Sequence, residues 1–175
     1  MKRIVILLVL LLLFTSCGQQ NRIPSFDAYP MTLTGTLSYN GSCFAVTALL
    51  QDRDQADITI ASPENLSGYS FKVDNTGVWV YYDNMQIELH NTNIDIPFSF
   101  LPRMLDVSRE DFTQYRTDSE NRIYHYTKDS HSTVIYIRRT EQLPHRIEYT
   151  EGGISLVFDI ENFIVQRGDT DADLQ

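Results

Sequence analysis

The sequence predicts a mainly β protein: one curved antiparallel sheet of about ten short strands, with a single short helical insert around residues 98–115. Three observations support this prediction. Long stretches of the chain alternate apolar and polar side chains with a period of two, as half-buried strands do. Residues typical of tight turns separate these stretches at hairpin spacing. In one segment after residue 96, apolar side chains recur instead at helical spacing.

The first half of the domain is predicted to be a series of hairpins. From Met31 to Tyr39, apolar residues alternate with threonine and serine, and Asn40-Gly41 then supplies the positive φ angles of a type I′ turn. Turn-forming residues separate each later strand from the next. The further strands are expected at 44–50, 56–61, 69–73, 78–82 and 85–90, and together with the first they would form an antiparallel meander.

The helical insert follows. Ser99 can cap its start and Pro102 is tolerated in a first turn. The segment Ser108-Arg109-Glu110-Asp111 resembles a second helix start, which predicts one or two further helical turns through Phe112 and Tyr115. Strands are expected again at 122–127, 133–139, 145–150 and 154–160. The apolar residues expected to form a lid over the sheet are Phe98, Phe100, Leu101, Met104 and Leu105.

The N-terminus has the layout of a secretory signal peptide. Lys2 and Arg3 precede an apolar run from Ile4 to Phe14, which is shorter than the roughly 20 residues of a membrane-spanning helix. The small pair Thr15-Ser16 before Cys17 resembles the bacterial lipobox, with Phe14 in place of the usual leucine. The resemblance implies that residues 1–16 are removed and that Cys17 is acylated. We therefore expect a lipoprotein anchored in the cell membrane on its extracytoplasmic face.

The expected organisation is a signal peptide at 1–16, a lipidated N-terminus and tether at 17–30, a folded domain at 31–166 and an acidic disordered tail at 167–175. The net charge is −9, and loss of Lys2 and Arg3 makes the chain more acidic still. Such a surface repels nucleic acid, so nucleic acid is not an expected partner. The remaining cysteine, Cys43, is expected to be a small buried apolar residue.

The sequence offers little that points to catalysis. His90, His125, His131 and His145 are scattered, and no two of them have helical metal-binding spacing. There is no calcium-loop pattern, no glycine-rich phosphate-binding turn and no nucleophile elbow. We therefore expect no enzyme activity, no cofactor and no metal site.

The inward face of such a sheet carries more apolar surface than one short helix covers. Either side chains fill this space, which periodicity alone favours, or a cavity remains that can receive an acyl chain. Trp79 and Tyr81 are expected on the other face of their strand. The favoured interpretation is that a neighbouring element packs over them; the alternative is that their rings are exposed and bind a partner. The residues expected to line the hydrophobic cavity are Leu33, Phe44, Val46, Ile60, Phe71, Val80, Leu89, Leu156 and Phe158.

Two parts of the chain resemble a known family. One is the strand-turn-strand unit 56–71, in which Ser62-Pro63 ends a strand and Asn65-Leu66-Ser67-Gly68 leads into the next, followed by 78–82. The other is 143–149 with 154–158 and Asn162-Phe163. Over residues 31–165 the sequence resembles the LolA/LolB-like outer-membrane lipoprotein carrier superfamily, particularly its small clostridial-type lipid-anchored members. The resemblance implies an open half-barrel, lidded by helices, that binds lipoprotein acyl chains or related lipids.

The sequence departs from the carriers in this family. Segment 18–30 has no long helix, the chain is expected to be anchored, and no long apolar loop stands out. A fixed module that binds an acyl chain or other hydrophobic ligand therefore fits better than a transporter of lipoproteins. The alternative implied by the family is a non-catalytic regulatory or structural lipoprotein that binds an envelope protein such as a cell-wall hydrolase.

Overall fold

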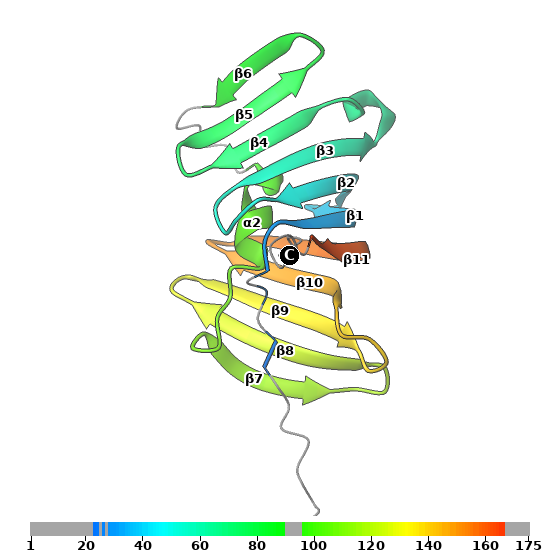
Figure 1. The fold of residues 1–175 in the computed structure, drawn as a ribbon, viewed down its shortest axis with the longest axis vertical. Coiled ribbons are helices and arrows are strands. Elements are labelled where there is room, and N and C mark those ends of the chain that lie inside the picture. The colour runs from blue at the N-terminus through cyan, green and yellow to red at the C-terminus, as the bar shows by residue number, and fades with distance from the viewer. Residues whose placement is uncertain (1–22, 25, 27, 90–95, 167–175) are drawn as a thin grey trace, which may run out of the picture.

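The computed structural model of the protein describes residues 23, 24, 26, 28–89 and 96–166. These residues form one eleven-stranded sheet in which every neighbouring pair of strands is antiparallel (Figure 1). The sheet is open, because β6 and β7 at its two edges do not pair with each other. The predicted fold class, a mainly β half-barrel with a short helical insert, is confirmed.

The sheet consists of two meanders that meet at its centre. In the first, each strand pairs with the next in sequence: β1 (Met31–Tyr39), β2 (Ser42–Leu50), β3 (Ala56–Ser62), β4 (Ser70–Asp74), β5 (Gly77–Tyr82) and β6 (Met85–Leu89). The second contains β7 (Phe112–Thr117), β8 (Asn121–Lys128), β9 (His131–Arg138), β10 (Pro144–Glu151) and β11 (Ile154–Val165). The first and last strands, β1 and β11, join the meanders.

Glycine is required where the two meanders join. The register of β1 against β11 shifts at Thr34/Gly35, so that β11 has one extra residue there. A Cβ atom on Gly35 would lie 2.1 Å from the backbone oxygen of Asp159. The close approach of these two backbones is therefore possible only with hydrogen as the side chain.

The helical insert is shorter than the sequence predicts. A 3₁₀ turn, η2 (Pro97–Phe100), leads into one turn of helix, α2 (Leu101–Met104). The predicted continuation of helix through Phe112 and Tyr115 is wrong, because these residues belong to β7. Their rings pack against those of Tyr126 and Tyr124 on β8, at centroid distances of 5.9 and 5.2 Å. Pairing with β8 thus outweighs the local helix-start signal, and it raises the strand count from about ten to eleven.

The core lies between the insert and one face of the sheet, which we call the inner face. This face carries Leu33, Ile58 and Ile147, each at most 1% exposed, and the insert packs against it. The opposite, outer face carries the alternate polar positions of the strands. Cys43 lies on the outer face beside Ser38 and is exposed, so the prediction that it is buried is wrong: its position in the alternation of β2 directs it away from the core.

Candidate functional site

All five predicted lid residues are buried. Phe98, Phe100, Leu101, Met104 and Leu105 are each at most 9% exposed and belong to the core. Phe98 is central, because its ring lies 5.3 Å from that of Phe44 on β2 and 4.6 Å from that of Phe71 on β4. The insert therefore covers the middle of the inner face.

The predicted cavity residues divide into two groups. Leu33, Val46, Ile60, Leu156 and Phe158 are at most 2% exposed and form closed core beneath the insert. The other four, Phe44, Phe71, Val80 and Leu89, are half-buried and lie on the β2 to β6 side of the sheet. Side chains thus fill the centre of the half-barrel, and the accessible apolar surface lies toward β6.

The N-terminal segment covers the other side of the inner face. Phe26 is 7% exposed and its ring lies 6.3 Å from that of Phe163 on β11. The Tyr126 hydroxyl donates a hydrogen bond of 3.1 Å to the Pro24 carbonyl oxygen. Burial raises the pKa of Tyr126 well above its usual value. The sequence pattern does not predict this cover, because an isolated Phe26 in a proline-containing segment gives no periodic signal.

The inner face continues past the insert as an apolar strip on β5 and β6. Cross-strand pairing places Val80 opposite Ile87 and Tyr82 opposite Met85, on the same face as Phe71. Tyr82, Met85 and Ile87 are 41%, 58% and 54% exposed, although they continue the row of side chains that forms the core. We define the apolar strip as Val80, Tyr82, Met85, Ile87 and Leu89. Exposed apolar surface that is contiguous in this way is typical of a binding site.

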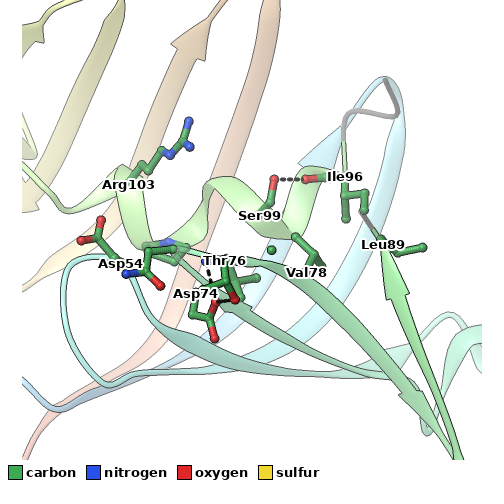
Figure 2. Close-up of a pocket in the computed structure, with 12 residues that line it drawn as sticks. Asp54, Asp74, Thr76, Val78, Leu89, Ile96, Ser99 and Arg103 are labelled. Atoms are coloured by element: carbon green, nitrogen blue, oxygen red, sulfur yellow. Dashed lines mark hydrogen bonds between the residues drawn. The ribbon is translucent and has the colours of Figure 1, made fainter. Parts of the chain in front are cut away.

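A pocket of about 440 Å³ lies at one end of the strip, between the insert and the β4–β5 turn (Figure 2). Val73, Val78, Leu89, Ile96 and Pro102 contribute its apolar wall. The polar residues that line it are Asp54, Asp74, Asn75, Thr76, Ser99 and Arg103. The pocket therefore combines an apolar wall with a larger polar rim, so it offers contacts to both the apolar and the polar part of a ligand.

Hydrogen bonds order the polar rim. The Asp74 carboxylate accepts bonds from the Thr76 backbone N–H at 2.8 Å and from its hydroxyl at 2.7 Å. Partial burial alone raises the pKa of Asp74, but these bonds outweigh it and hold the pKa below its ordinary value. The Ser99 hydroxyl donates to the Ile96 carbonyl oxygen at 2.8 Å and so fixes the entry to the insert (Figure 2).

Ion pairs connect the insert and the residues after it to the ends of β8 and β10 and to the β2–β3 loop. Arg103 on α2 pairs with Glu151 of β10 at 3.3 Å, and the Tyr149 hydroxyl donates to the same carboxylate at 2.6 Å. Asp106, just after α2, pairs with Lys128 at 2.6 Å and with Arg53 at 3.6 Å. These contacts hold the insert against both halves of the sheet.

The chemistry-bearing residues of the sequence do not converge in the described part of the chain. His125, His131 and His145 lie on β8, β9 and β10, and burial lowers the pKa of His125 and of His145. Among residues 23–89 and 96–166, with positions 25 and 27 set aside, no group of three or more His, Cys, Asp or Glu side chains could hold a metal ion. His90 lies outside the described residues.

The signal peptide, Cys17 and the acidic tail at 167–175 also lie outside the described residues. Within the described ones, no helix has the length and apolar character needed to cross a membrane.

Comparison with solved structures finds likeness of fold at low identity. A LolA superfamily protein from Nitrosomonas europaea is 8% identical, with a TM-score of 0.43 over 82% of this chain and 89% of its own. A protein from Vibrio parahaemolyticus described as an outer membrane lipoprotein-sorting domain is 10% identical, with a TM-score of 0.44 over 82% and 88%. An uncharacterized conserved protein from Thermus thermophilus is 14% identical, with a TM-score of 0.41 over 83% and 88%.

The likeness is one of fold. The first protein is named for the LolA superfamily, and the second for outer membrane lipoprotein sorting. No protein-family model and no curated protein matches the chain.

Proposed function

We propose that this chain is an extracytoplasmic lipoprotein, held in the membrane through an acylated Cys17, whose half-barrel binds an acyl chain or another hydrophobic ligand without catalysis. The observation that carries the proposal is the apolar strip. Its side chains continue the inner face of the sheet beyond the insert, where Met85 and Ile87 are more than half exposed. A ligand with apolar carbon would bury this surface, and burial of apolar surface is the main favourable term in such binding.

The strip and the pocket together suit a molecule that is apolar over most of its length and polar at one end. The strip follows β6, whose five residues span about 17 Å at about 3.3 Å each. It ends at Leu89, which also lines the pocket with Asp54, Thr76 and Arg103. The apolar chain would lie along the strip and its polar group in the pocket.

The energetics indicate what a tight complex requires. Full burial of ten methylene groups is worth about 8 kcal/mol, equivalent to a dissociation constant of about 1 μM before ordering costs. An open strip covers only about one side of the chain, so about half of this free energy, and millimolar affinity, is expected. Tighter binding requires the insert to move, so that the ligand displaces Phe98 and packs against Phe44 and Phe71 instead.

A displacement assay with a hydrophobic dye tests the proposal on residues 18–175. Dodecanoate should displace the dye saturably from the unchanged protein. Ile87→Ser should weaken the apparent affinity about threefold or more, because it removes apolar contact from the middle of the strip. Ile164→Ser is the matched control, since Ile164 is 57% exposed on β11 and Ile87 is 54% exposed. Equal effects of the two variants, or the absence of dye uptake, would contradict the proposal.

The closed core beneath the insert favours one alternative to ligand binding. Leu33, Leu156 and Phe158 are fully or almost fully buried beneath the insert, as in a half-barrel filled by its own side chains. The alternative is a regulatory or structural lipoprotein that binds an envelope protein such as a cell-wall hydrolase. A dye assay with no saturable uptake would favour this alternative, and affinity capture from detergent-solubilised envelopes would then be the next experiment.

A further inference from the structure

The outer face of the sheet carries a row of aromatic side chains on β5 that the proposed ligand site does not use. Trp79 and Tyr81 alternate along β5 with Val78 and Val80, which lie on the inner face, so the two aromatic rings lie on the outer face. Both are half-buried. A Cβ atom built on Gly77 would lie 4.0 Å from Cη2 of Trp79. The indole therefore extends along the strand toward Gly77, which has no side chain to cover it.

Polar side chains flank both rings. Cross-strand pairing places Lys72 opposite Trp79 on one side and Ser70 opposite Tyr81, and the same two positions pair with Asp57 and Thr59 on β3. A hollow of about 310 Å³ lies here and is lined by Asp57, Thr59, Ser70, Lys72 and Tyr81, among others. Hydrogen-bond donors and acceptors thus surround the aromatic side chains in a shallow depression.

We propose that this outer hollow, together with Trp79 and Tyr81, binds a neutral oligosaccharide. A hexose has apolar C–H faces that stack on aromatic rings and a rim of hydroxyl groups that hydrogen-bond to flanking polar side chains. The two rings are two residues apart, which corresponds to about 7 Å along a strand, and this spacing is comparable to the length of one hexose unit. Two successive sugars of an extended glycan could therefore each stack on one ring.

Charge decides between a glycan and other partners. Asp57 and Lys72 in the hollow are cross-strand neighbours of opposite sign, and Glu88 lies opposite Trp79 on β6, so the site as a whole is neutral to weakly acidic. The chain as a whole carries −9 charges, which disfavours anionic polysaccharides. An acyl chain would remove water from Lys72 and Asp57 without offering them hydrogen bonds in return. A protein partner is also disfavoured, because the centre of a protein interface usually contains few charged residues. A neutral glycan satisfies these groups through its hydroxyls and leaves them partly in water.

Trp79 is the single tryptophan of the chain, so intrinsic fluorescence reports on this site directly. The experiment uses the full chain in a detergent without a sugar headgroup and titrates it with chitotetraose and, separately, with cellotetraose. We expect a saturable change in the emission of Trp79 with at least one of the two. The difference between the two probes would show whether the acetamido group contributes to binding.

Calorimetry on variants completes the test. Tyr81→Ala should weaken binding at least tenfold. Lys72→Met, at an exposed position where folding is not at risk, should weaken it about threefold. Tyr136→Ala is the matched control, because Tyr136 is a half-buried tyrosine at an outer-face position of β9, and it should bind as the unchanged protein does. The proposal is overturned if neither glycan gives a saturable signal, or if Tyr81→Ala and Lys72→Met bind as tightly as Tyr136→Ala.

Discussion

Gly35→Ala should destabilise the protein more than any other glycine to alanine change in the described chain. Gly35 lies where β1 and β11 join the two meanders, and a Cβ atom there would be 2.1 Å from the Asp159 carbonyl oxygen. An ordinary contact needs at least 3.4 Å. The two backbones would have to move apart by more than 1 Å, although each is also held on its other side, β1 by β2 and β11 by β10.

The cost can be estimated from this geometry. Loss of about two backbone hydrogen bonds costs about 1 kcal/mol each, and overpacking adds about 1 to 3 kcal/mol. We expect a decrease of about 3 to 5 kcal/mol in the free energy of unfolding, which is a large part of the 5 to 15 kcal/mol typical of a domain. The control is Gly41→Ala in the β1–β2 turn. Gly41 has φ +78° and open space around it, so only the left-handed backbone is strained, at a cost of about 1 to 2 kcal/mol.

Equilibrium urea unfolding, followed by far-ultraviolet circular dichroism, measures both variants. The free energy of unfolding comes from the midpoint and the m-value. If Gly35→Ala costs no more than Gly41→Ala, the account of the join between β1 and β11 is wrong.

Three further predictions concern the insert, the turn before β7 and the anchor. Phe98→Ala should lower the free energy of unfolding by about 3 to 4 kcal/mol in urea unfolding, because it removes a 5% exposed ring between Phe44 and Phe71. Burial raises the pKa of Asp111, but hydrogen bonds from the Ser108 N–H and hydroxyl outweigh it and lower the pKa below 3.8. The ionised Asp111 carboxylate therefore stabilises the fold above pH 3.8, and this stabilisation is lost as the pH falls through its lower folded-state pKa. In urea titrations, the difference in free energy of unfolding between the unchanged protein and Asp111→Asn should shrink over that pH range. Cys17→Ala should abolish incorporation of radiolabelled lipid and release the protein from membranes; persistent labelling would refute the lipobox interpretation.

Local pattern was sufficient to predict most strands. Each strand has one buried and one solvent-exposed face, so the alternation of apolar and polar residues is visible in a short stretch of sequence. Turns such as Asn40-Gly41 have the positive φ angles that these residue types predict. The pairing of β1 with β11 left no such signal, because it joins residues more than a hundred positions apart and depends on tertiary packing. The start of β7 was predicted as helix for a related reason. Ser108 and Asp111 do make local turn contacts, but Phe112 pairs with β8 and is half-buried there against the core.

The candidate site was predicted in part. The lid residues could be found from their helical spacing, and the residues of the inner face from their alternation. What the sequence could not show is which part of that face stays uncovered, since this depends on where Phe98 and Phe26 pack. The polar residues of the pocket, such as Thr76 and Arg103, come from a turn and from the insert. Only the fold brings these two segments together.

The most direct test of the proposed function is native mass spectrometry of residues 18–175, purified from cells without detergent. If the insert moves and an acyl chain occupies the place of Phe98, binding is tighter than the millimolar affinity of the open strip. The protein should then carry lipid in near-stoichiometric amount, and Ile87→Ser should carry less than Ile164→Ser. A mass equal to that of the bare chain for all three proteins would contradict tight binding of an acyl chain beneath the insert and would favour the filled half-barrel with a protein partner.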